Sequence, residues 1–183
     1  MKKLSIESIK KMIPPETFWF FETLVKDTGH LDGQGCFAAE DIPEGSLICI
    51  AGGCVTERRP EIDKKYCYAV NFGPDLYITP QDYSQPGHEW MINHHCTSNV
   101  MVFNGTHFFA RRDIGSGEEL FIDYSVQLAG REDAVLRCRC ESKACRKLIT
   151  GDDYKGELGR KFFKEFCVPI QQLLIMRANR RGE

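Results

Sequence analysis

The chain has 183 residues, a hydrophobic fraction of 42% and a formal net charge of −2, which suits one domain core or one domain with an appendage. The small net charge and a pI near 6.2 argue against nucleic acid or a membrane surface as the direct partner. No stretch reaches the ~20 apolar residues that span a bilayer, and residues 1–15 lack the apolar run and the small-residue cleavage site of a signal peptide.

The first thirty residues are expected to form a helical extension. Pro14 and Pro15 suit the first positions of a helix, where a missing backbone donor costs nothing. Apolar side chains then recur at helical spacing, at Phe18, Phe21, Leu24 and Val25. Gly29 ends the pattern, and we expect this helix to pack on the edge of the domain.

Residues 31–126 have the texture of a compact, mostly β domain. Short apolar runs, punctuated by Gly, Pro or Asn-Gly, occur at 47–50, 67–72, 76–79, 101–103 and 107–110. Short strands at this density indicate small sheets. Asn104-Gly105 is the strongest hairpin signal, and residues 58–85 are predicted to form a variable insert.

Three cysteines lie close together in the segment 127–150. The chain contains nine cysteines, and their odd number without a secretory signal indicates reduced thiols in the cytoplasm or the nucleus; secretion by a microbe into a host cell stays open. The C-x-C-x4-C spacing of Cys138, Cys140 and Cys145 favours a metal site over disulfides. A structural zinc needs four ligands, and the spacing leaves the fourth open among Cys96, Cys167, His94 and His95. The cysteines without such a context are predicted to be small core residues; they are Cys36, Cys49, Cys54, Cys67 and Cys167.

The segment 151–183 is predicted to be helical. Leu158, Phe162 and Phe166 follow one another at four-residue steps, and Pro169 interrupts the pattern. Because proline in a helix interior loses a hydrogen bond, we expect two short helices. A lid packed on the core is favoured over a helix that binds a partner.

Two further patterns carry the functional interpretation. Gly33-Gln34-Gly35 is a glycine turn. Alone it is weak evidence for a binding site, because such turns are common. The sequences N-H-H-C at 93–96 and G-E-E-L-F-I-D-Y at 117–124 follow in a fixed order before the cysteine tail. Together with G-C-F-A at 35–38 and I-P-E-G at 42–45, these motifs resemble the SET domain with a post-SET zinc tail, the family that methylates lysine side chains of proteins. The resemblance covers about two-thirds of the chain.

The resemblance implies a fold and a division of the chain. The fold would be mostly β with flanking helices (α+β), with small sheets and a knot-like C-terminal threading. The SET domain would span 31–126 and the post-SET tail 127–150, between the N-terminal extension 1–30 and the helical segment 151–183.

The resemblance also implies a site for S-adenosylmethionine, with S-adenosylhomocysteine as the product. Its cofactor-binding positions fall on Gly33, Gln34, Gly35, Tyr66, Asn93, His94 and Tyr124. Tyr124 would be the catalytic residue, with its hydroxyl at the methyl-transfer centre. Cys96 would complete one structural zinc site with Cys138, Cys140 and Cys145. The partner would be a protein with a target lysine, such as a histone tail, while the oligomeric state is not indicated.

The chemistry of methyl transfer agrees with these residue types. The nucleophile is a neutral lysine amine, and a lysine with a pKa of ~10.4 is almost entirely charged at neutral pH. An apolar channel or a nearby cation favours the neutral amine, and holding it in line with the methyl group is a positioning task. A phenol can orient the reactants without acting as a strong base, whereas Glu119 and Asp123 are expected to support the fold.

Three positions depart from the family pattern. Ala51 stands where many members have a tyrosine lining the lysine channel, Ile122 where members have Phe or Tyr, and His95 where Ser is usual. Loss of ring volume at the first two positions predicts a wider channel that permits di- or trimethylation. The same departures favour the alternative function, a catalytically weak SET-fold module that binds a protein segment. A third alternative is a zinc-stabilised interaction domain without a cofactor.

Overall fold

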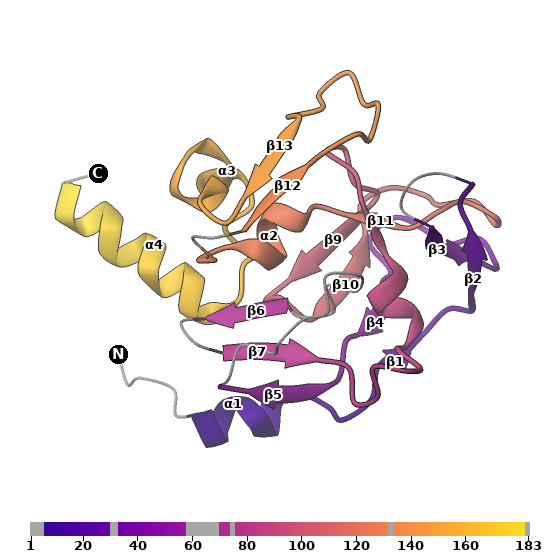
Figure 1. The fold of residues 1–183 in the computed structure, drawn as a ribbon, viewed down its shortest axis with the longest axis horizontal. Coiled ribbons are helices and arrows are strands. Elements are labelled where there is room, and N and C mark those ends of the chain that lie inside the picture. The colour runs from indigo at the N-terminus through magenta and orange to yellow at the C-terminus, as the bar shows by residue number, and fades with distance from the viewer. Residues whose placement is uncertain (1–5, 30–32, 58–69, 74–75, 132–133, 182–183) are drawn as a thin grey trace.

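The computed structural model describes residues 6–29, 33–57, 70–73, 76–131 and 134–181. Within these residues, small β-sheets surround an apolar core, and helices flank them at the two ends of the chain (Figure 1). The predicted fold class, mostly β with flanking helices, is confirmed. No helix in the described ranges is long and apolar enough to cross a membrane.

The largest sheet has four antiparallel strands. Their order across the sheet is β1 (Phe18–Trp19), β4 (Leu47–Ile50), β10 (His107–Ala110) and β9 (Val100–Phe103). The hairpin predicted at Asn104-Gly105 joins β9 to β10, and both residues have positive φ angles, 51° and 78°. These angles match the two-residue turn that suits the twist of a hairpin.

Smaller sheets surround this one. β5 (Cys54–Thr56), β7 (Leu76–Thr79) and β6 (Val70–Gly73) form a three-stranded sheet, against which α1 (Ile6–Met12) packs through β5. β2 (Thr23–Asp27) and β3 (Gln34–Ala38) form an antiparallel pair. The short helix η1 (His88–Met91) lies against this pair.

The helix predicted over residues 14–29 is wrong. The N-terminal helix α1 ends at Met12, and β1 and β2 occupy residues 18–19 and 23–27. Each strand pairs with a distant one, Phe18 with Ile50 and Val25 with Cys36. The strand pairing satisfies the backbone hydrogen-bonding groups of these residues, and aromatic and β-branched side chains suit a pleated surface. Strand pairing therefore overrides the helical spacing of the apolar residues.

One parallel pair brings two of the motifs together. β8 (Asn93–His94) pairs with β11 (Phe121–Ile122), so that Phe121 lies opposite Asn93 and Ile122 opposite His94. A bridge between Phe37 and Glu119 links the segment before β11 to β3. α2 (Tyr124–Leu128) follows at once, and β12 (Val135–Arg137) and β13 (Leu148–Thr150) form a hairpin around the cysteine tail.

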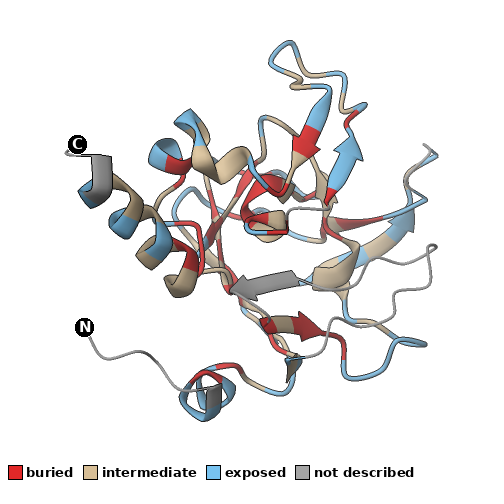
Figure 2. Ribbon diagram, turned by 60° about the vertical axis from the view of Figure 1, so that its left-hand side comes forward, coloured by how far each residue is buried: buried red, intermediate tan, exposed pale blue. Residues whose placement is uncertain are grey.

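The C-terminal segment forms a lid over the core, as predicted. It consists of η2 (Asp153–Lys155), α3 (Glu157–Lys161) and α4 (Val168–Arg181). Pro169 lies in the first turn of α4, where it removes no needed donor, so two helices form, although the second has 14 residues. Figure 2 shows that α4 carries both buried and exposed residues, and Phe166 and Ile170 are fully buried.

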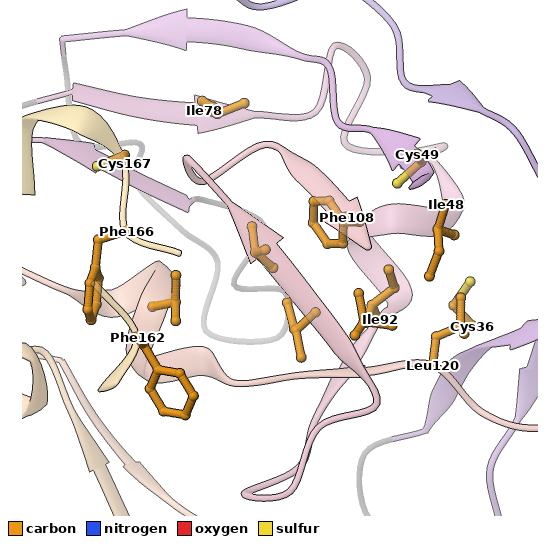
Figure 3. Close-up of a cluster of buried hydrophobic side chains, with 14 of the residues drawn as sticks. Cys36, Ile48, Cys49, Ile78, Ile92, Phe108, Leu120, Phe162, Phe166 and Cys167 are labelled. Carbon is orange, nitrogen blue, oxygen red and sulfur yellow. The ribbon is translucent and has the colours of Figure 1, made fainter. Parts of the chain in front are cut away.

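The core extends from the β-sheets to this lid (Figure 3). Phe108 of β10 and Leu120 are buried in the same cluster as Phe166. The cysteines Cys36, Cys49 and Cys167 are buried as predicted. Cys54 is exposed, which contradicts its prediction as a core residue, and Cys67 lies outside the described residues.

Arg111 on the β10 side holds the lid through a buried ion pair. Its Nη2 donates to both carboxylate oxygens of Glu165 at 2.6 Å, and its guanidinium lies 5.4 Å from the Phe162 ring centroid. The hairpin turn adds a backbone bond from Asn104 N to Lys164 O at 3.1 Å. The lid is therefore fixed to the sheet by polar as well as apolar contacts.

Candidate functional site

Four cysteines predicted as metal ligands gather where the tail meets β8. The Sγ atom of Cys138 lies 3.7 Å from that of Cys96 and 3.6 Å from that of Cys145. The Cys96 amide donates to Cys140 Sγ at 3.5 Å. Thiols separated by up to 49 residues of sequence thus lie close together. Cys145 joins them through Cys138 and is not among the donor atoms that lie mutually within 4.8 Å.

The acidity of these thiols is shaped by their surroundings. Burial raises the pKa of Cys138 and of Cys96. Burial also disfavours the Cys140 thiolate, but backbone amides of Cys96 and Ser142 and the neighbouring thiols lower its pKa to about 6. Cys140 is thus more readily ionised than Cys96 or Cys138, and the thiolate is the form that binds metals.

His94 is also close to this cluster. Ligand atoms of His94, Cys96, Cys138 and Cys140 all lie within 4.8 Å of one another, and His94 Nε2 is 3.4 Å from Cys96 Sγ. However, His94 Nδ1 accepts a hydrogen bond from the Tyr124 amide at 3.1 Å. Burial lowers the pKa of His94 to about 4, so the ring is neutral and carries its proton on Nε2. His94 is then a donor to the Cys96 sulfur, the arrangement of a residue that orients a metal ligand.

Tyr124 is the first residue of α2, and its position is fixed from several sides. Asp123 caps this helix, because its Oδ1 accepts from the Ser125 amide at 3.0 Å. The Tyr124 hydroxyl donates to the backbone oxygen of Ile92 at 3.0 Å. The rings of His94 and Tyr124 have centroids 5.4 Å apart. The structure therefore brings Tyr124 directly against the segment that contains Asn93 and His94.

Arg146 links the tail to the same helix and was missed by the sequence analysis. Its Nη2 donates to Asp123 Oδ1 at 2.5 Å, and its amide donates to Cys96 Sγ at 3.4 Å. The available signal was a positive residue directly after Cys145 and a negative one directly before Tyr124. Their distance in the sequence, 23 positions, gave no reason to pair them.

The glycine turn meets Asn93. The Gln34 carbonyl accepts from Asn93 Nδ2 at 3.0 Å, and Gly33 has a positive φ of 75°, a conformation that favours glycine. A Cβ atom on Gly35 would collide with Glu119 Oε1 and lie 2.8 Å from Thr28 Cγ2. Packing within the protein is thus sufficient reason for a glycine at position 35.

Glu119 joins these two motifs. Its Oε1 accepts from Asn93 Nδ2 at 2.8 Å. From the sequence, Glu119 was expected only to support the fold, whereas its carboxylate accepts a hydrogen bond from the side chain of a predicted cofactor-binding residue. The spacing of G-E-E-L before Tyr124 could not have shown this contact.

The remaining positions singled out in the sequence make fewer contacts with Asn93, His94 and Tyr124. Tyr66 lies outside the described residues. Ala51 is half-buried and donates from its amide to Thr106 O at 2.8 Å, and Ile122 is 1% exposed. His95 donates from its amide to Ile122 O at 3.1 Å, and its ring is tilted by 42° against that of Phe121, with centroids 5.2 Å apart.

Comparisons with known proteins agree with this geometry. A family model described as the SET domain matches residues 33–125. The chain is 30% identical over 129 residues to an H3 lysine-4 specific histone-lysine N-methyltransferase of Mycosarcoma maydis, an alignment that covers 63% of this chain and 9% of that protein. It is 30% identical over 138 residues to the probable histone-lysine N-methyltransferase set-23 of Caenorhabditis elegans, which covers 64% of this chain and 55% of that protein.

A solved structure shares the fold. The methyltransferase domain of human histone-lysine N-methyltransferase SETMAR superposes with a TM-score of 0.53 at 22% identity, over 72% of this chain and 58% of that one. The chain spans 10% or less of the length of the first four curated relatives that it matches.

Proposed function

Because the chain belongs to the SET domain family, we propose that it transfers methyl groups from S-adenosylmethionine to the side-chain amine of lysine in a protein substrate. One observation carries the proposal. Asn93 and His94 come from one motif and Tyr124 from another, yet β8 pairs with β11 and the Tyr124 hydroxyl donates to Ile92 O at 3.0 Å. The proposed cofactor-binding and catalytic side chains are thereby held next to one another by the β8–β11 pair and the start of α2.

The residues around Asn93 suit the methyl donor. Gln34 O and Glu119 Oε1 accept the hydrogen bonds of the Asn93 side-chain nitrogen. Among the described residues, none donates a hydrogen bond to the Asn93 side-chain oxygen. That oxygen, with the backbone of Gly33, Gln34 and Gly35 and the residues His94 and Tyr124, would hold S-adenosylmethionine, and Tyr66 is added on the family resemblance alone. The bound cofactor supplies an electrophilic methyl group on a sulfonium.

Tyr124 would place the lysine amine. Its hydroxyl is anchored at Ile92 O, and the side chains of Ile92 and Ile122 are buried. Apolar surroundings disfavour the ammonium form of lysine, so the neutral nucleophile is favoured where the phenol can orient it. His94 would hold Tyr124 through its backbone amide, and Asp123 would fix the start of the helix by accepting from the Ser125 amide.

We also propose one structural zinc, bound by Cys96, Cys138, Cys140 and Cys145. The donor set fits, because four thiolates form one of the closed tetrahedral sites of structural zinc. The hydrogen bonding of His94 favours a role as a donor to Cys96 rather than as a ligand. The tail has little core of its own, with exposed Val135 and Leu136 in β12, so metal binding would stabilise it.

The substrate class rests on the relatives. A histone tail is the first candidate, because the curated relatives are named as histone-lysine methyltransferases. Such a substrate agrees with reduced thiols in the nucleus or the cytoplasm. The alternative, a SET-fold module that binds a protein segment without turnover, is favoured by Ala51, which offers no ring to a lysine channel.

An assay with radiolabelled S-adenosylmethionine separates the two functions. Purified protein would be incubated with a panel of histones and with cell lysate, with Tyr124→Phe as the matched blank. We expect label on a protein substrate with the wild-type chain only. Thermal stabilisation by S-adenosylhomocysteine, measured in both proteins, reports cofactor binding independently of turnover. Cofactor binding without label on any substrate would favour the binding module, and no stabilisation at all would overturn the proposed function.

A further inference from the structure

We propose that one face of the four-stranded sheet is the surface through which two copies of this chain form a dimer. This face is turned away from the core, and aromatic and aliphatic side chains cover it. The proposal does not depend on methyl transfer, because the residues concerned lie outside the proposed cofactor and zinc sites.

The register of the sheet assigns its side chains to two faces. Residues directly opposite one another on paired strands share a face, and successive residues of one strand alternate between the faces. Cys49 of β4, Phe108 of β10 and Val102 of β9 are paired in one row and are at most 2% exposed. This row forms the core face, and Figure 3 shows Cys49 and Phe108 within the buried cluster.

The opposite face, which we call the outer face, is apolar as well. Its first row crosses all four strands and consists of Phe18, Ile50, His107 and Phe103. Its second row consists of Leu47, Phe109 and Met101. Phe20 follows β1 and extends the face, since its ring centroid lies 5.1 Å from that of Phe18. A sheet face turned to water normally carries polar residues, so the outer face has the composition of a surface that another molecule covers.

The outer face exposes a substantial apolar area. Phe18, Phe20 and Phe103 are 61%, 49% and 37% exposed, and the other five side chains are partly exposed. Since an aromatic side chain buries about 200 Å², these three rings alone offer on the order of 300 Å². Trp19, which lies between Phe18 and Phe20, packs against the core. The exposed rings are therefore not the result of a loosely packed strand.

The area and composition of the outer face favour a second copy as its occupant. With the partly exposed side chains included, it offers on the order of 500 Å², so two copies would bury about 1,000 Å² in total, where specific interfaces begin. Homodimer interfaces are more apolar than other interfaces and are enriched in aromatic residues and Met. A symmetric dimer uses the same patch on both copies.

The charges of the outer face point to the same occupant. Its eight residues include no Lys, Arg, Asp or Glu, so packing the face on a copy of itself brings no formally charged side chains together. A basic peptide would find no carboxylate on it, and a membrane surface would find none of the basic residues that it attracts. Two sheets packed face to face enclose a layer about 10 Å thick that side chains of this kind fill.

Sedimentation velocity with the full chain tests the dimer. We expect the wild-type protein to change from one to two chains per particle as its concentration rises through the micromolar range. Phe18 and Phe103 lie on the two outermost strands of the sheet. Phe18→Asp and Phe103→Asp should each weaken the dimer by roughly a hundredfold, because a symmetric interface contains every substitution twice.

Control measurements separate dimerisation from folding. Val135→Asp is the matched control, because Val135 is 65% exposed and belongs to another sheet, and it should dimerise as the wild type does. Thermal melts in dilute solution, where the wild-type chain is a monomer, should show that Phe18→Asp and Phe103→Asp fold. Their positions are exposed, so the monomer gains little from the aromatic rings.

Three outcomes would overturn the proposal. They are a wild-type chain that stays a monomer at every concentration, a dimer that survives either Phe18→Asp or Phe103→Asp, and a dimer that Val135→Asp weakens as strongly as they do. A wild-type dimer that transfers no methyl group would instead remove the proposed function and leave the dimer in place. Sedimentation and the radiolabel assay therefore distinguish the two failures.

Discussion

Arg146 and Asp123 form a largely buried ion pair, with 2.5 Å between Nη2 and Oδ1, that joins the cysteine tail to the start of α2. Only 2% of the Asp123 side chain and 22% of the Arg146 side chain are exposed. Asp123 also caps the helix that begins with Tyr124. The tail is therefore linked to the proposed catalytic residue by two routes. One runs from Arg146 to Asp123, which precedes Tyr124, and the other runs from the cysteine cluster to His94, which accepts from the Tyr124 amide.

Replacing Arg146 with Gln should destabilise the protein and lower turnover. Asp123 would keep its charge in a buried place without its partner, and breaking such a pair costs about 3 kcal/mol, near the lower end for buried pairs because Arg146 is partly exposed. Chemical denaturation with zinc present would measure the loss. The exposed Arg139→Gln is the control and should stay within ~0.5 kcal/mol of wild type. Equal stabilities for the two variants would remove this role from Arg146.

The cysteine cluster should contain one zinc per chain. Metal analysis of freshly purified protein should give this ratio, and Cys138→Ser combined with Cys140→Ser should abolish it and unfold the tail, because metal binding and folding are coupled. A chelator should lower the melting temperature in the same way. The exposed Cys54→Ser serves as the control. An intact fold without metal in the double variant would contradict the assignment.

Tyr124→Phe should keep cofactor binding and lose most turnover. The substitution removes the hydroxyl that donates to Ile92 O, at a cost to stability of about 1 kcal/mol. A positioned polar group at a reacting centre contributes on the order of a hundredfold or more to the rate. Turnover with radiolabelled cofactor and binding of S-adenosylhomocysteine would be measured side by side. Tyr83→Phe, at an exposed position, should behave as wild type, and undiminished turnover in Tyr124→Phe would exclude the role.

Ile122 should permit the addition of more than one methyl group. We expect di- or trimethylated product from the wild-type protein and a shift toward the monomethyl product in Ile122→Tyr, because the ring fills space near Tyr124. Since Ile122 is fully buried, the larger side chain should also cost about 1–3 kcal/mol. Mass spectrometry of the methylated substrate reads out the product. A wild-type reaction that stops at one methyl group with excess cofactor would contradict this prediction.

Glu165→Ala should destabilise the protein more than Glu165→Gln. Glu165 is 4% exposed and binds Arg111 through both oxygens, and burial raises its pKa although Arg111 opposes this. The alanine variant leaves a guanidinium without its partner, at about 3 kcal/mol, whereas glutamine retains a hydrogen-bonding oxygen. Thermal denaturation would compare them, with exposed Glu157→Ala as the control. Equal losses would show that charge pairing contributes little to the attachment of the lid.

The sequence predicted those features that depend on local chemistry. Asn104-Gly105 specified its turn because two adjacent positive φ angles need such residues. The cysteine spacing predicted a metal site, and Cys138 and Cys140 are among the donor atoms that lie close together. Residues 18–27 were predicted wrongly, because their strands are defined by partners at 34–38 and 47–50. Glu119 and Arg146 were not assigned to the site for a related reason. Their partners, Asn93 and Asp123, are distant in the sequence, and only the folded chain brings them into contact.

The hydrogen bonds between the Asn104-Gly105 turn and the C-terminal lid affect when the protein can fold during synthesis. Gly105 donates to Glu165 O at 3.1 Å, and Gln171 donates to Asn104 Oδ1 at 2.9 Å. During synthesis the hairpin leaves the ribosome some sixty residues before these partners do. Until then, the apolar surface that Phe166 later covers stays open to water and to chaperones. Contacts of such long sequence separation also slow folding, so the native packing of this core can form only after residues 164–171 have been synthesised.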